Sequence, residues 1–122
     1  MKKAIYLFCA LVWCSLACNK EGVGGKASIQ GVVRHGTVII TDAIVYIKYG
    51  ADNFPGFDSQ LYDDNVISAS DGSYSFRNLY KGDYYLYVMG FDATINESVS
   101  GGVGVKLEKK RESKDLDIAV EK

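Results

Sequence analysis

Residues 70–89 read SDGSYSFRNLYKGDYYLYVM, and this stretch decides the fold. It contains two runs, Tyr74-Ser75-Phe76 and Tyr84–Met89, in which side chains alternate with the two-residue period of a β-strand. A turn sequence precedes each run, Asp71-Gly72 and Lys81-Gly82-Asp83, because glycine adopts positive φ at little cost. The pattern predicts two strands, and it predicts that both rings of the first run enter one core.

The segment Leu79–Tyr84 has the spacing of a tyrosine corner, in which a buried ring sends its hydroxyl back to an upstream backbone group. This interpretation sets the direction of the second run. The side chains expected in the core are Tyr84, Leu86 and Val88, and those expected on the outward face are Tyr85, Tyr87 and Met89. Tyr46 from a neighbouring strand is expected to join the outward pair of tyrosines.

The same alternation continues on both sides of this stretch. Further strands are expected at 28–33, 38–40, 43–49, 66–69, 98–107 and 116–120. Gly101-Gly102 predicts a bulge or bend, and Glu108–Lys114 predicts a solvated hairpin turn in which Lys109-Lys110-Arg111 is offset by nearby acids. A parallel sheet needs helical crossovers, and no helical period of useful length is present. The sequence therefore predicts an all-β fold, an antiparallel Greek-key β-sandwich of seven or eight strands.

The composition argues against several classes of function. The chain has 122 residues, of which 48% are hydrophobic and 24% charged, as in a single globular domain. A formal net charge of −1 argues against a nucleic-acid partner. One His and three Cys leave little room for a metal cluster or a catalytic triad. We therefore expect no enzyme activity, no cofactor and no metal centre, and His35 is expected to be a surface turn residue.

The N-terminus has the pattern of an export signal. Lys2-Lys3 precede an apolar run, Ala4–Ala17, that is too short to cross a hydrocarbon core of roughly 30 Å. This pattern predicts a signal peptide at residues 1–17, the alternative being a buried N-terminal helix. Ser15-Leu16-Ala17-Cys18 resembles a bacterial lipobox, although the strict pattern has Leu and a small residue where Ser15 and Leu16 stand.

Cys9 and Cys14 lie inside this signal, so Cys18 would be the single Cys of the mature chain. We expect Cys18 to be lipidated, for example with palmitate, the alternative being an ordinary signal peptide that leaves a free thiol. Residues 18–26 then form the lipidated Cys and a Gly-rich flexible tether, and residues 27–122 form the sandwich domain. The expected location is the outer membrane of a Gram-negative bacterium, on the periplasmic side or at the surface.

Four segments together resemble the carboxypeptidase regulatory-like domains, which are transthyretin-like sandwiches similar to the Cna-type repeats of surface proteins. They are Ile29–Val33, Ala43–Ile47, Ser70–Phe76 and Leu79–Val88. The resemblance implies a transthyretin-like fold and a stability, binding or spacing role without catalysis. Relatives of transthyretin that hydrolyse a purine-derived ring use several His and Arg residues, whereas His35 is the only histidine here.

The longest irregular stretch, Gly50–Asn65, carries the candidate binding residues. It places Phe54, Phe57 and Tyr62 beside carboxylates that include Asp63 and Asp64, a combination typical of sugar-binding loops. The alternative is that the two Phe rings plug an open end of the sandwich. The acidic side chains offer hard oxygen ligands for Ca²⁺, but their spacing matches no known Ca²⁺ loop, and the alternative is a solvated acidic loop.

Tyr85 and Tyr87 are the second candidate group, because exposed tyrosines are common in interfaces. The alternative is that they form cross-strand pairs on a solvated sheet. We therefore expect a non-catalytic, lipid-anchored envelope protein that acts as a binding or structural accessory module. The alternative is a carbohydrate-binding accessory lipoprotein of a surface glycan-uptake system. The expected partners are the membrane, through the lipid on Cys18, and a protein or glycan.

Overall fold

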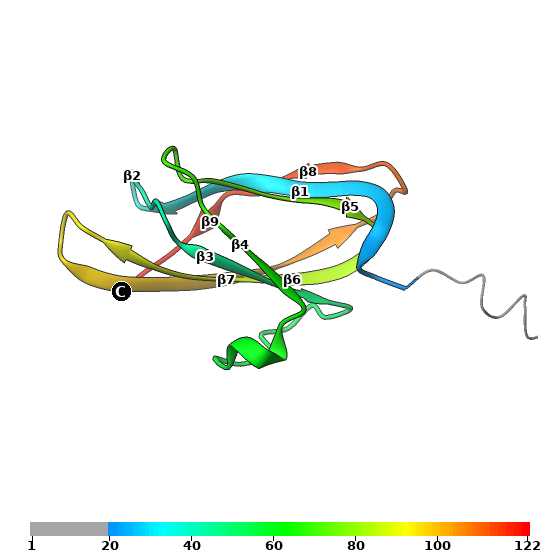
Figure 1. Ribbon diagram of the computed structural model, residues 1–122, viewed down its shortest axis with the longest axis horizontal. Helices are drawn as coiled ribbons and strands as arrows, with labels where there is room; N and C mark the ends of the chain where they lie inside the picture. The colour runs from blue at the N-terminus through cyan, green and yellow to red at the C-terminus, as the bar shows by residue number, and fades with distance from the viewer. Residues whose placement is uncertain (1–19) are drawn as a thin grey trace, which may run out of the picture.

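The computed structural model describes residues 20–122, which form a two-layer β-sandwich (Figure 1). The predicted signal peptide and Cys18 lie outside these residues. The nine strands are β1 Val23–His35, β2 Val38–Ile39, β3 Ile44–Tyr49, β4 Asp64–Ile67, β5 Ser73–Leu79, β6 Gly82–Asp92, β7 Glu97–Leu107, β8 Ser113–Asp115 and β9 Ile118–Ala119. A 3-10 turn, η1 Ser59–Leu61, lies in the long loop. No helix among residues 20–122 is long and apolar enough to cross a bilayer.

One layer is a four-stranded antiparallel sheet in the order β4-β3-β6-β7. Alternate residues of its strands fill the core, and Tyr84, Leu86 and Val88 of β6 have no exposed surface. From β5 in the other sheet, Tyr74 and Phe76 enter the same core. These inward directions confirm the predicted strand phases.

The other layer is a five-stranded sheet built around β1. Strands β2 and β5 run antiparallel to β1, whereas β8 and β9 run parallel to it. The expected hairpin at 108–114 is therefore wrong, because β7 and β8 belong to different sheets. A parallel pair forms here without a helix because the chain reaches β8 from the opposite layer and not directly from β1.

The Gly-rich segment before residue 27 is part of the domain and not a flexible tether, because β1 begins at Val23. Gly25 packs so closely on the Leu79 carbonyl that any Cβ there would overlap it, and a Cβ on Gly24 would lie 2.5 Å from the Tyr80 hydroxyl. The strand is also irregular, since the pairing with β5 shifts between Val23 and Ala27. Glycine serves close approach here, which composition alone cannot distinguish from flexibility.

The tyrosine corner is present and it fixes the start of the domain. The buried Tyr84 hydroxyl donates to the Tyr80 carbonyl at 2.6 Å and accepts the Gly22 N–H at 2.9 Å. The Gly22 carbonyl accepts the Tyr80 N–H at 2.8 Å. One hydroxyl therefore joins the N-terminal segment to the β5–β6 connection.

The predicted bulge at Gly101-Gly102 is absent, because β7 pairs with β6 without interruption from Leu107 to Glu97. These glycines instead make room on both faces of the strand. Gly101 lies against the Ala119 carbonyl, and the Tyr85 ring covers Gly102. The pairing of the edge strand stays regular, and other groups pack directly on its backbone.

Candidate functional site

The outer face of the four-stranded sheet carries apolar side chains on its central strands. Tyr46 lies directly opposite Tyr87, and Ile44 lies opposite both Met89 and Ile67. Antiparallel sheets usually turn a polar face to water when their other face covers the core. The outward row of β6, from Tyr85 to Phe91, instead holds three rings and Met89, with polar residues such as Lys48 and Asn65 on the neighbouring strands.

The loop from Gly50 to Asp63 lies on this outer face, below the lower sheet in Figure 1. Ring centroids of Phe54, Phe57 and Tyr62 lie 5.2, 6.1 and 6.1 Å from that of Tyr87. The Tyr87 side chain points outward as predicted, but the loop covers it and leaves it 6% exposed. We call these four rings, with Tyr46 and Tyr85, the aromatic cluster.

Phe54 and Phe57 do not plug an end of the sandwich, so that alternative is wrong. They pack edge to face at 4.9 Å on the outside of the sheet, and they remain 41% and 77% exposed. Phe57 is the most exposed large apolar side chain among residues 20–122. The loop thus displays one ring to solvent while its other rings hold it to the sheet.

Hydrogen bonds hold the loop in this position. The Tyr62 hydroxyl donates to the Gly56 carbonyl at 2.8 Å, and burial among the cluster raises the pKa of Tyr62 to about 12. Asp63 accepts the Tyr49 N–H at 2.7 Å and lies 3.6 Å from the Lys48 ammonium. The Asp63 carboxylate therefore supports the end of the loop.

The remaining acids of the loop are spread out. Asp58 accepts the Gln60 N–H at 2.9 Å at the start of η1, and Asp64 is exposed at the first position of β4. In residues 20–122 no group of three or more His, Cys, Asp or Glu side chains could hold a metal ion. Asp58 binds the backbone of its own loop, and Asp63 binds the backbone at the end of β3.

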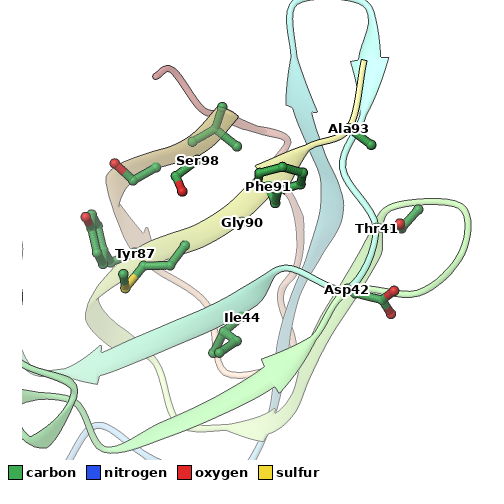
Figure 2. Close-up of a pocket in the computed structure, with 11 residues that line it drawn as sticks. Thr41, Asp42, Ile44, Tyr87, Gly90, Phe91, Ala93 and Ser98 are labelled. Atoms are coloured by element: carbon green, nitrogen blue, oxygen red, sulfur yellow. The ribbon is translucent and has the colours of Figure 1, made fainter. Parts of the chain in front are cut away.

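A hollow of about 560 Å³ lies at the other end of the same face (Figure 2). Its lining combines apolar side chains with hydroxyls and one carboxylate, and its main members are Thr41, Asp42, Ile44, Tyr87, Met89, Phe91, Ser98 and Ser100. Met89 and Phe91 are 47% and 50% exposed beside it. Since Tyr87 belongs to both, the hollow and the aromatic cluster form one continuous surface.

Most residues of this hollow were not among the candidates expected from the sequence. The alternation that placed Met89 on the outward face continues to Phe91, and following it two residues further would have found that ring. Ser98 and Ser100 lie opposite Phe91 and Met89 on β7. No local signal in the sequence marks these serines, because their importance comes from the strand pairing.

His35 was expected to be a surface turn residue, but its ring is paired with a carboxylate. Its Nδ1 lies 2.7 Å from a carboxylate oxygen of Asp92, which is 1% exposed. The hydroxyl and N–H of Thr94 donate to the other oxygen at 2.5 and 2.9 Å. The Thr94 hydroxyl and then His35 hold the pKa of Asp92 below its usual range. This pair joins β1 to β6 and so ties the two sheets together.

Comparisons with known proteins support the fold. No family model and no curated protein match the chain. Among solved structures, the major pilin subunit of Bacillus cereus superposes with a TM-score of 0.55 at 14% identity, over 80% of this chain and 30% of the pilin. A putative carbohydrate binding protein from Pseudomonas aeruginosa superposes with a TM-score of 0.50 at 13% identity, over 86% of this chain and 93% of that protein.

A DUF3823 family protein from Parabacteroides merdae is similar at 16% identity over 77% of this chain and 45% of that protein, with a TM-score of 0.46. The chain thus spans less than half of this protein and less than a third of the pilin subunit. At such low identities a likeness shows the fold alone. This chain has the β-sandwich architecture that the sequence predicted.

Proposed function

We propose that this chain is a non-catalytic, lipid-anchored module of the bacterial cell envelope that binds a partner on the outer face of its four-stranded sheet. One observation carries the proposal, the exposed apolar surface on that face. Its exposed members are Phe54, Phe57, Ile67, Met89 and Phe91. Contiguous apolar patches of this kind mark interaction sites on soluble domains, because leaving them in water is unfavourable.

The lining of the hollow suits a binding role better than a catalytic one. Of the side chains that line it, only Asp42 and Tyr87 are titratable. Catalytic sites usually bring together several titratable groups. The lining instead combines hydroxyls and a carboxylate with an aromatic wall, which suits recognition without reaction.

A carbohydrate is a more specific candidate for the bound partner. Sugar rings present apolar C–H faces that stack on aromatic rings, and their hydroxyls need hydrogen-bonding groups nearby. Phe57 and Phe91 offer exposed rings, while Thr41, Asp42 and Ser100 offer polar groups in the hollow. The sandwich of similar shape from Pseudomonas aeruginosa is described as a putative carbohydrate binding protein, which is consistent with this candidate.

We also propose that the sandwich is of the transthyretin-like, carboxypeptidase regulatory-like kind. The motif residues of that resemblance take the expected positions. Asp71 accepts the N–H and hydroxyl of Ser73 at 3.0 and 2.6 Å in the turn before β5, and Tyr84 forms its corner. The structural neighbours share the β-sandwich architecture with this chain.

Site-specific crosslinking tests the binding face. A photoreactive residue at Met89 of the full chain, expressed in a Gram-negative host, should give a discrete adduct that the same residue at Arg77 does not give. Arg77 is a matched control because it is exposed on the outer face of the other sheet. Equal labelling at the two positions would contradict the proposed face. A glycan array probed with the full chain decides the finer candidate, since failure to bind any saccharide would exclude it.

Detergent partitioning tests the anchor. The wild-type chain should enter the detergent phase and incorporate labelled palmitate, because Cys18 follows a lipobox-like sequence. Cys18→Ser should abolish the labelling and leave either uncleaved precursor or water-soluble protein. Persistent palmitate labelling of the Ser variant would show that the anchor lies elsewhere.

A further inference from the structure

One end of the sandwich carries most of the exposed positive charge. Figure 1 shows that the N-terminal segment leaves the domain at the end where β5 joins β6 and β7 joins β8. Hydrogen bonds confirm the proximity, since Gly22 bonds to Tyr80 and the Ser28 N–H donates to the Glu112 carbonyl at 2.9 Å. The exposed cations of these segments are Lys20, Lys26, Lys81, Lys106, Lys109, Lys110 and Arg111.

Lys81 and Lys106 come together although they are far apart in the sequence. They line one shallow hollow of about 430 Å³ with Gly82, Leu107 and Glu108. The pairing of Gly82 with Leu107 brings the two connections side by side. The turn that holds Lys109-Lys110-Arg111 follows directly, so the cations form one surface at the end of the molecule.

The acids at this end offset only part of that charge. The Glu112 carboxylate accepts the N–H groups of Glu108 and Lys109 at 2.9 and 3.1 Å, and it lies 3.5 Å from the Lys114 ammonium. The Glu21 carboxylate lies over Gly82 and 3.4 Å from the Asp83 N–H. Asp83 lies opposite Lys106 in the β6–β7 pair, and Glu108 is the exposed acid of the turn. The seven exposed cations outnumber these four acids.

This end is also the one closest to the proposed lipid. Because Tyr84 and Tyr80 fix Gly22 in the domain, only four Cα–Cα steps separate it from Cys18. Four steps reach at most about 14 Å, and the Debye length at physiological salt is about 8 Å. A lipid on Cys18 would therefore keep the cationic end within two Debye lengths of the headgroups, where the attraction is screened only in part.

We infer that this end of the sandwich faces the membrane and binds anionic phospholipid headgroups. The inference rests on the proposed lipid anchor for its location, and on the charges of the described residues for its chemistry. The chain then stands with its β6–β7 connection, residues 93–96, pointing away from the bilayer. The binding face runs along the side of the molecule, with its hollow toward the free end.

Hydrogen exchange on the full lipidated chain tests the inference. The chain is reconstituted in vesicles of phosphatidylcholine, with or without phosphatidylglycerol. Backbone amides at 108–112 and 80–83 should exchange more slowly with phosphatidylglycerol present, and high salt should remove the protection. Amides at 93–96 should show no change. Equal exchange in both kinds of vesicle would overturn the inference.

Two charge variants and a control with inorganic phosphate sharpen the test. Lys110→Glu should lose the phosphatidylglycerol-dependent protection, whereas Lys122→Glu makes the same change in net charge outside the cationic end and should keep it. Inorganic phosphate in place of phosphatidylglycerol should give no protection. Protection by free phosphate would indicate a small anion site and overturn the membrane assignment. A chain that does not stay with either vesicle would instead refute the lipid anchor.

Discussion

The two outer faces of this sandwich have opposite chemistry. On the five-stranded sheet, Gln30 donates to Ser113 and Asp115 at 2.9 and 2.7 Å, and Asp117 accepts the Val32 N–H at 3.0 Å and lies 3.6 Å from Arg34. On the four-stranded sheet, the outward row of the central strand β6 holds Tyr85, Tyr87, Met89 and Phe91. Both faces belong to one domain and cover the same core.

The comparison shows that a sheet of this sandwich does not require an apolar outer face. A solvated sheet can carry a polar outer face, as the mixed five-stranded sheet does. Tyr87, Met89 and Phe91 lie outside the core between the sheets, because none of them points into it. The apolar face is therefore an added feature, partly covered by the chain's own loop and partly left open.

The largest expected effect concerns the covered part of this face. Tyr87→Ala removes the ring on which Phe54, Phe57 and Tyr62 pack, and it should cost about 3–5 kcal/mol, as truncation of a buried aromatic side chain does. Urea denaturation measures the free energy of unfolding. A cost below about 1 kcal/mol would mean that the loop does not depend on the sheet for its position.

A smaller effect is expected from the bond that closes the loop. Tyr62→Phe leaves the Gly56 carbonyl without its 2.8 Å partner and should cost about 1 kcal/mol. The pH dependence gives a second readout. Burial raises the pKa of Tyr62 from 10.0 to about 12, so this side chain contributes stability below pH 10 that is lost as the pH rises toward 12.

Ultraviolet titration of tyrosinate measures this ionisation. The wild type should show one more late-titrating tyrosine than Tyr62→Phe, and the variant should lose less stability between pH 10 and 12. Unchanged titration would contradict burial of this hydroxyl under the loop. Burial also raises the pKa of Tyr49, Tyr74 and Tyr84, so their signals remain in both proteins and serve as an internal reference.

Part of the fold was predictable from the sequence, and part of it was not. Strand phase in β5 and β6 and the tyrosine corner were predictable because alternation and turn spacing are local signals. The glycines were misinterpreted at Gly24, Gly25, Gly101 and Gly102, since glycine serves flexibility, bulges and close approach alike. Which of these applies depends on a partner such as Leu79 or Ala119, and only the fold brings that partner near.

The sequence identified most residues of the aromatic cluster, but it did not predict how they are arranged. Phe54, Phe57, Tyr62, Tyr85 and Tyr87 were singled out, and the structure brings all five together. That the loop would lie on the sheet and bury Tyr87 depends on contacts across 25 residues or more of chain. The pair of His35 and Asp92 is 57 residues apart, and no local pattern in the sequence indicates it.

The next prediction concerns the open part of the face. Phe57→Ala should change the free energy of unfolding by only about 0.5 kcal/mol, because the ring is 77% exposed and loses mainly its edge contact with Phe54. Crosslinking from Met89 should nevertheless fall sharply if Phe57 belongs to the binding surface. Thermal melts and adduct yield measure the two effects separately. A large loss of stability with unchanged crosslinking would make Phe57 a structural residue.

The smallest effect is expected on the polar face. Gln30→Ala removes two exposed hydrogen bonds, to Ser113 and Asp115, and a third from the Ser28 hydroxyl. Water can replace these bonds, so the free energy of unfolding should change by about 0.5 kcal/mol or less. The yield of the Met89 adduct should stay at the wild-type level. The variant tests whether the two faces differ energetically as well as chemically. If Gln30→Ala destabilised the domain more than Tyr62→Phe, the polar network would be a structural requirement. The contrast between a polar face with little effect on stability and an apolar face kept for binding would then fail.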